Sequence, residues 1–241
     1  MKSHNIAAQT TPRARKIAGL AMNRPNVVAT VHTPAGLRIA SKLDSDDVDV
    51  VEFRLDALAD RVDEIERILS VLKVPALLTA RHPAEGGVNH LPLATRRSLL
   101  LRLLPLASLV DVELRSVKSL AGVISVAKSR GVRVVVSDHH FKRTPSLTDL
   151  LKRERAAFHA GADIFKLATN TTKVRDFTTL LDFISQKNKH PRAVMGMGIF
   201  GKVSRLAMAK AGSILNYGYL DQPNAPGQWE ARELKKLILQ A

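Results

Sequence analysis

The chain has 241 residues, with 37 Lys and Arg against 22 Asp and Glu and a formal net charge of +15. Apolar residues make up 45%, too many for a disordered chain, and no apolar run is long enough to span a membrane. The chain contains no Cys, which excludes disulfides, thiol nucleophiles and thiolate zinc sites. This composition fits a reducing compartment, and we predict a cytoplasmic protein.

The positive charge raises the question of a nucleic-acid partner. Aromatic residues make up only 4% of the chain and its basic residues are spread along it, whereas single-strand binders stack bases on aromatic side chains. We therefore predict a basic surface with no nucleic-acid partner and no membrane. A basic nucleic-acid-binding module is the alternative from a different class, and it predicts strongly salt-dependent binding.

The first 25 residues contain five basic residues and no acidic one. We interpret residues 1–25 as a basic N-terminal arm, with a transit peptide as the alternative. No linker divides the remainder, so residues 26–241 are predicted to form one catalytic domain.

Short apolar runs alternate with longer amphipathic runs from residue 26 onwards. The apolar runs predict eight strands, over 26–32, 49–54, 75–81, 108–115, 132–137, 162–168, 192–197 and 213–217. Apolar residues at helical spacing predict helices over 60–72, 95–104, 147–159, 173–186, 202–211 and 230–240. Alternating strands and helices indicate a parallel sheet, and eight such units fit the α/β class as a (β/α)8 TIM barrel. A doubly wound open sheet is the alternative.

The faces of the predicted strands favour the barrel. In the second strand Val51, Phe53 and Leu55 point one way, and the charged Glu52 and Arg54 point the other. An open parallel sheet has helices on both faces, so both faces should be apolar. A closed barrel instead turns its charged face toward the mouth at the carboxyl ends of the strands, where barrel enzymes keep their sites.

Lys166 lies in an otherwise apolar predicted strand, over 162–168. Burial disfavours the charged form of an amine, and a neutral amine in a pocket can attack a ketone to form a Schiff base. The alternative is a lysine at a strand end whose ammonium reaches water.

His139 follows the fifth predicted strand, where an imidazole can reach the mouth and transfer protons. His140 beside it suggests a metal, but no third ligand has suitable spacing, and we predict no metal site. Arg81 and Glu85 follow the third strand, and Glu85 is placed to orient a histidine.

Two further polar residues follow the last strands. Arg205 begins a predicted helix after the seventh strand, a region that binds anions in many barrels, and Arg can grip a carboxylate with two hydrogen bonds. Gln228 ends a loop rich in Pro and Gly after the eighth strand, and this loop could form a lid over the mouth.

These residues and their neighbours strongly resemble the type I 3-dehydroquinate dehydratases, the Schiff-base class of the shikimate pathway. The resemblance runs from about residue 26 to residue 228. Its motifs are Glu52-Phe53-Arg54, residues 81–87, Asp111-Val112-Glu113, residues 137–141 with Thr144-Pro145, Ala162-Asp163-Ile164 with Lys166, Met195-Gly196 with Ser204-Arg205, and Ala225-Pro226-Gly227-Gln228.

The resemblance implies a hydro-lyase that converts the small molecule 3-dehydroquinate to 3-dehydroshikimate, the third step toward chorismate and the aromatic amino acids. It implies that Lys166 forms an imine, that His139 is the general acid and base, and that Glu85 holds His139 in place. No cofactor is expected, and a homodimer is compatible with the family. The implied substrate-binding residues are Thr30, Glu52, Arg54, Arg81, Arg205, Asn224 and Gln228, with Arg205 on the carboxylate.

The chain departs from the family pattern in four places. His140 replaces a usual Asp, Phe53 a frequent Trp, and Asn224 a frequent Ser; the first strand–helix unit, over 27–50, is short. None of these departures removes a catalytic group. Competing enzyme interpretations are another lysine-dependent barrel, such as an aldolase, and a barrel that has lost its activity.

Overall fold

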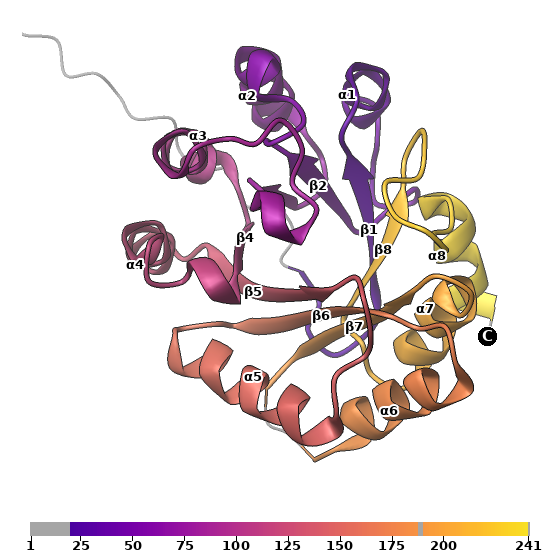
Figure 1. The fold of residues 1–241 in the computed structure, drawn as a ribbon. Helices are drawn as coiled ribbons and strands as arrows, with labels where there is room; N and C mark the ends of the chain where they lie inside the picture. Colours follow the sequence, from indigo (N-terminus) through magenta and orange to yellow (C-terminus); the bar gives the residue numbers. More distant parts are fainter. Residues whose placement is uncertain (1–19, 188–189, 241) are drawn as a thin grey trace, which may run out of the picture.

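The computed structural model describes residues 20–187 and 190–240. Strands and helices alternate along this part of the chain, and the helices surround the strands (Figure 1). The strands are β1 (Asn26–Val31), β2 (Val50–Arg54), β3 (Ala76–Thr79), β4 (Leu109–Glu113), β5 (Arg133–His140), β6 (Ile164–Asn170), β7 (Arg192–Met197) and β8 (Leu215–Tyr219).

The helices that separate the strands pack on the outside of the ring. They are α1 (Pro34–Ala40), α2 (Val62–Val71), α3 (Leu93–Leu103), α4 (Ala121–Ser129), α5 (Leu147–His159), α6 (Val174–Ser185), α7 (Gly201–Lys210) and α8 (Ala231–Gln240). Short 3-10 turns η1 (Ala59–Arg61), η2 (Pro83–Glu85), η3 (Leu104–Leu106) and η4 (Leu114–Ser116) complete the connections.

The strands form a nearly closed parallel barrel. Each strand from β1 to β6 pairs with the next one along the chain, and β8 pairs with β1, with Val28 opposite Tyr217. Between β7 and β8 the backbone N–H of Ile214 donates to the carbonyl of Arg192 at 2.9 Å. The prediction of a (β/α)8 TIM barrel is confirmed, and the open-sheet alternative is wrong.

Alternate residues of each strand enter two separate apolar layers. Val51 and Phe53 pack outward against the helices, whereas Val50 packs inside the barrel. In β6, Phe165 faces outward and Ile164 faces inward. Because side chains alternate along a strand, Glu52 and Lys166 share the inner face, as the charge pattern predicted.

The described strands match all eight predicted ones, with β5 running three residues past its predicted end, so that His139 lies on the strand itself. The sequence did not predict α1 and α4. The predicted basic arm lies mostly outside the described residues. Leu20, at its described end, packs into the inner apolar layer. No helix within 20–187 or 190–240 is long and apolar enough to cross a membrane.

Candidate active site

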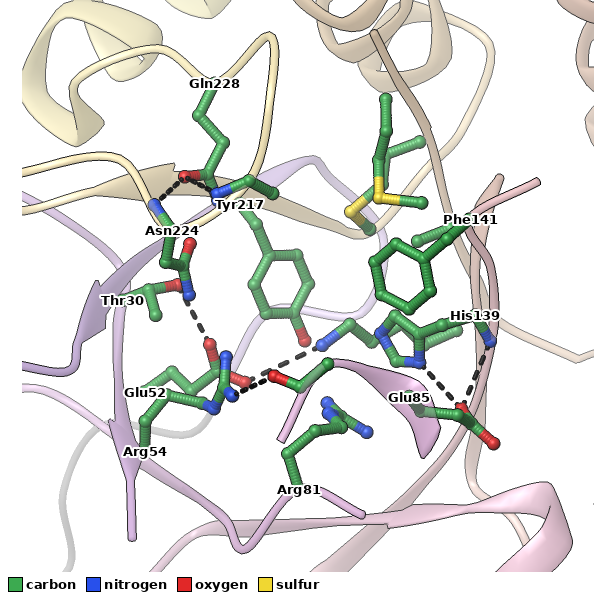
Figure 2. Close-up of a pocket in the computed structure, with 16 residues that line it drawn as sticks. Thr30, Glu52, Arg54, Arg81, Glu85, His139, Phe141, Tyr217, Asn224 and Gln228 are labelled. Atoms are coloured by element: carbon green, nitrogen blue, oxygen red, sulfur yellow. Dashed lines mark hydrogen bonds and ion pairs between the residues drawn. The ribbon is translucent and has the colours of Figure 1, made fainter. Parts of the chain in front are cut away.

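A pocket lies inside the barrel mouth, at the carboxyl ends of the strands (Figure 2). Every predicted site residue lines it except Arg205, which is buried just behind the wall. The lining residues are Thr30, Glu52, Arg54, Arg81, Glu85, Gly86, His139, Phe141, Lys166, Ala168, Met195, Met197, Tyr217, Asn224, Ala225 and Gln228.

Lys166 is almost completely buried, with 4% of its surface exposed. Its Nζ lies 3.1 Å from Oδ2 of Asp111 and 3.6 Å from Oε1 of Glu52. The same nitrogen lies 3.9 Å from the centre of the Tyr217 ring. Two carboxylates and an aromatic face therefore hold the amine inside the barrel, and it does not reach out to bulk water.

Asp111 is the centre of a buried ion-pair network. Its two carboxylate oxygens accept hydrogen bonds from both terminal nitrogens of Arg81 at 2.9 Å, and Ser137 Oγ donates to it at 2.6 Å. Burial opposes ionisation, but Arg81 and Lys166 outweigh it and hold the pKa of Asp111 far below its usual range. Glu113 also pairs with Arg81, so protein carboxylates hold both terminal nitrogens of this guanidinium.

His139 is held by Glu85 through two contacts to one oxygen. Glu85 Oε2 lies 2.9 Å from the ring Nδ1 and 3.2 Å from the His139 backbone nitrogen. Because that oxygen accepts the backbone N–H, we assign the ring proton to Nδ1, which leaves the Nε2 lone pair free. The residue is thus oriented as a proton acceptor.

Burial shifts both members of this pair toward their neutral forms. It raises the pKa of Glu85 to about 8. Burial, together with the positive charges of Arg81 and Lys166, lowers the pKa of His139 well below 6.5. An imidazole that is neutral at physiological pH can act as a base without first losing a proton.

Glu52 is fixed by hydroxyls from two neighbouring strands. Thr30 donates to Oε2 and Thr79 donates to Oε1, both at 2.8 Å. Burial disfavours the Glu52 carboxylate, but the charges of Lys166 and Arg54 outweigh burial and lower its pKa.

Arg54 is positioned by a carboxylate and by the turn after β3. It makes two hydrogen bonds to Asp56, at 2.8 and 2.9 Å, and one to the carbonyl of Gly86 at 3.0 Å. This link anchors the turn that carries Glu85 to the end of β2.

Arg205 is a buried cation without a carboxylate partner among the described residues. Its Nε donates to the carbonyl of Tyr217 at 3.0 Å, and its Nη1 contacts the carbonyls of Gly196, Gly201 and Gly227 at 2.7 to 2.9 Å. Burial lowers its pKa to about 10, so the guanidinium keeps its charge at neutral pH. A buried unpaired charge is unfavourable, and an anion beside it would relieve that cost.

The loop after β8 is braced over the pocket by Gln228. Its Oε1 accepts the backbone N–H groups of Asn224 and Ala225, at 2.9 and 3.2 Å. Gly227 adopts a φ of +73°, and a Cβ there would lie 2.7 Å from the Gly201 Cα. This position therefore requires glycine for the loop to pack on α7.

Sequence reasoning assigned no role to several residues that complete the site. Tyr217 and Asp111 contact Lys166, while Phe141 lies beside His139 with ring centres 6.3 Å apart. The period-two pattern of β4 and β8 carried a usable signal, since it turns Asp111 and Tyr217 inward. Within the described ranges no group of three or more His, Cys, Asp or Glu is arranged to hold a metal ion.

The fold and the pocket define a TIM-barrel enzyme with a buried lysine, and with a carboxylate-oriented histidine in the same pocket. A model of the type I 3-dehydroquinase family matches residues 27–240. The chain belongs to this family, and its predicted assignment as a lyase, a 3-dehydroquinate dehydratase (EC 4.2.1.10), is confirmed.

Individual relatives support the same assignment. The 3-dehydroquinate dehydratase of Methanothrix thermoacetophila is 32% identical over 222 residues, covering 92% of this chain and 94% of that protein. The enzyme of Methanocella arvoryzae is 35% identical over 211 residues, covering 87% and 94%.

Solved structures of 3-dehydroquinate dehydratases share the fold of this chain. The 3-dehydroquinate dehydratase of Geobacillus kaustophilus has a TM-score of 0.81 and 28% identity, covering 90% of this chain and 91% of that one. A type I enzyme from Clostridium difficile, solved with covalently modified comenic acid, has a TM-score of 0.81 and 25% identity, covering 90% and 92%.

Proposed function

We propose that this chain dehydrates 3-dehydroquinate through an imine on Lys166, with His139 as general acid and base. The observation that carries the proposal is a single pocket that contains the buried Lys166 amine and an imidazole oriented by Glu85. The covalently modified ligand in the Clostridium difficile relative supports covalent chemistry in this fold.

Imine formation starts with transfer of one proton from Lys166 to His139. The amine lone pair then forms the C–N bond to the ketone carbon, and the proton left on nitrogen moves to the oxygen. His139 returns its proton to that hydroxyl, which leaves as water. The product is a protonated imine, which withdraws electrons from the adjacent carbon.

Elimination follows on that adjacent carbon. His139 removes a proton to give an enamine, whose electron pair expels the neighbouring hydroxyl as His139 protonates it. Hydrolysis of the conjugated imine releases 3-dehydroshikimate and restores Lys166. One acid–base group therefore serves both proton transfers of the elimination, and the lysine supplies the electron sink.

The substrate carboxylate is assigned to Arg205, whose charge has no acidic partner among the described residues. We propose that the remaining predicted binding residues contact the ring hydroxyls of 3-dehydroquinate. They are Thr30, Glu52, Arg54, Arg81, Asn224 and Gln228. The cytoplasmic location and the homodimer stay predictions, which cell fractionation and light scattering would test.

Borohydride trapping tests the imine. Reduction in the presence of 3-dehydroquinate should add a substrate-derived mass to the peptide that carries Lys166, and Lys166→Ala should lose both the label and turnover. Lys142→Ala, an exposed lysine beside the site, is the matched control and should keep both. A label on any other lysine would contradict the assignment.

The neighbouring histidines provide a matched pair for the acid–base role. His140 lies outside the pocket and pairs with Asp138 at 2.8 Å. His139→Ala should reduce formation of the ultraviolet-absorbing enone by about 10²- to 10⁴-fold, whereas His140→Ala should stay close to the unmodified enzyme. Equal activity of the two variants would exclude His139 from proton transfer.

A further inference from the structure

The Tyr217 hydroxyl is a buried donor that no described protein group uses. Tyr217 is 3% exposed, and its hydroxyl oxygen makes no hydrogen bond to any described residue. The ring projects from β8 into the centre of the pocket (Figure 2). Phenylalanine would fill the same space without a buried unpaired hydroxyl, which is unfavourable in a protein interior.

The neighbouring hydroxyls, unlike that of Tyr217, already donate hydrogen bonds to protein carboxylates. Thr30 and Thr79 donate to Glu52, and Ser137 donates to Asp111. The guanidinium of Arg81 is likewise occupied by carboxylates. Among the side-chain hydroxyls around Lys166 in the described structure, that of Tyr217 is therefore the one left available to a ligand.

The position of Tyr217 places its hydroxyl near the substrate ketone that Lys166 attacks. The Lys166 Nζ lies 3.9 Å from the centre of the Tyr217 ring. A carbonyl carbon poised for attack lies about 3 to 3.5 Å from that nitrogen, which brings the carbonyl group alongside the same ring. The ketone oxygen is thus the substrate atom closest to the reacting nitrogen that can accept a hydrogen bond from the phenol.

The hydroxyl also keeps its proton. Burial, together with the negative charges of Glu52 and Asp111, raises the pKa of Tyr217 well above 10. The phenol consequently acts as a hydrogen-bond donor and does not exchange its proton in the reaction.

We propose that Tyr217 donates a hydrogen bond to the ketone oxygen while Lys166 adds to the carbonyl carbon. This inference rests on the proposed imine mechanism. As the C–N bond forms, the carbonyl π electrons move onto oxygen, and the Tyr217 O–H stabilises the growing negative charge. The proton from the lysine nitrogen then neutralises that oxygen, and the phenol stays intact throughout.

Tyr217→Phe tests the role because it removes one oxygen and keeps the ring beneath Lys166. Rapid quenching with borohydride and mass spectrometry should show the Lys166 adduct forming about 10- to 100-fold more slowly, by analogy with the loss of one oxyanion donor. Tyr219→Phe, the other tyrosine of β8, does not line the pocket and should form the adduct at the normal rate.

A second readout separates chemistry from packing. With substrate deuterated at the carbon that loses its proton, Tyr217→Phe should show a smaller isotope effect on kcat, because imine formation then limits turnover. Its thermal stability should equal or exceed that of the unmodified enzyme, because the unpaired hydroxyl is gone.

The outcomes separate the two proposals. Adduct formation at an unchanged rate in Tyr217→Phe, with a normal adduct in the unmodified enzyme, would overturn the role of Tyr217 alone. Failure of the unmodified enzyme to form any adduct would overturn the imine mechanism and this inference together.

Discussion

The two sides of the barrel mouth treat their buried polar groups differently. Around β3, β4 and β5, Arg81, Asp111, Glu113 and Arg96 form a continuous ion-pair network. Around β8 and β1, buried side-chain atoms lack hydrogen-bond partners within the described structure. At this mouth they belong to His32, Tyr217, Asp221 and Asn224.

On the β3–β5 side the buried polar groups named above pair with one another. On the β8–β1 side a bound ligand can supply the missing hydrogen-bond partners. Paired charges at β3–β5 fix Lys166 before substrate arrives, because Asp111 also contacts its nitrogen at 3.1 Å. Near β8, the Arg205 charge and the Tyr217 hydroxyl retain binding capacity. We expect substitutions on the first side to reduce stability, and those on the second to reduce substrate binding and catalysis.

Asp111→Ala should have the largest effect, a loss of stability, because it leaves Arg81 without the carboxylate that accepts two of its hydrogen bonds. Breaking a buried ion pair of this kind costs about 3 to 5 kcal/mol of unfolding free energy, measurable by urea denaturation. Asp47→Ala, which breaks an exposed pair with Arg232, is the control and should cost about 1 kcal/mol or less. Similar losses in both variants would contradict a structural role for the network.

Arg205→Lys should have the second largest effect, which is on kcat/KM. Lysine keeps the charge but cannot bridge the four carbonyls and a carboxylate together. We expect kcat/KM to fall by about 10- to 100-fold, mainly through KM, a size typical of losing a charge-assisted contact. Arg175→Lys on the exposed face of α6 is the control, and a fall in kcat alone would argue against carboxylate binding.

Glu85→Gln should change how stability depends on pH. The native pKa of Glu85 is raised from 4.5 to about 8, so the folded protein keeps a proton that the unfolded chain releases. The stability that this proton contributes is present in acid and is lost as pH rises through this interval. Because Arg115, whose Nε lies 3.7 Å from Glu85 Oε1, favours the ionised form and offsets part of this effect, we expect a difference on the order of 1 kcal/mol between the two proteins.

Urea titrations at several pH values would measure it. The unmodified enzyme should lose stability between pH 4.5 and about 8 relative to Glu85→Gln. A difference that grew in the opposite direction would mean that Glu85 is ionised throughout this range.

Asn224→Ala should have the smallest effect. Its Oδ1 is buried and has no partner among the described groups, so removing it should leave the unfolding free energy unchanged or slightly higher. Losing one hydrogen bond to substrate should raise KM by a few-fold, roughly the worth of a neutral hydrogen bond. A clear loss of stability would show that Asn224 already supports the loop in the free enzyme.

The sequence predicted the strands and their inward faces because those depend on local alternation. Glu52 and Lys166 reach the pocket from the inner faces of their strands. The sequence did not predict α1 or α4 because neither has a strong local signal. α1 has seven residues and contains Gly36, and α4 contains Gly122 and β-branched residues that are weak helix formers.

Pairings between distant strands could not be read from the sequence. Arg81 was predicted to bind substrate, and no local pattern indicated that its guanidinium also pairs with Asp111, 30 residues away. Gln228 was predicted to cover the mouth, and its oxygen braces its own loop. Which polar groups satisfy each other depends on how the ring closes, and local patterns carry no information about that closure.

The interior of the barrel beneath Lys166 is filled by apolar side chains, among them Ile164, Val135, Leu109 and Val50. Within the described residues, these buried side chains separate the pocket from the amino ends of the strands. The water expelled as the lysine condenses, the water lost from the substrate ring and the water that cleaves the final adduct must all use the entrance that the substrate itself occupies. We therefore expect the rate of turnover to depend on how readily water molecules pass the bound substrate at the barrel mouth.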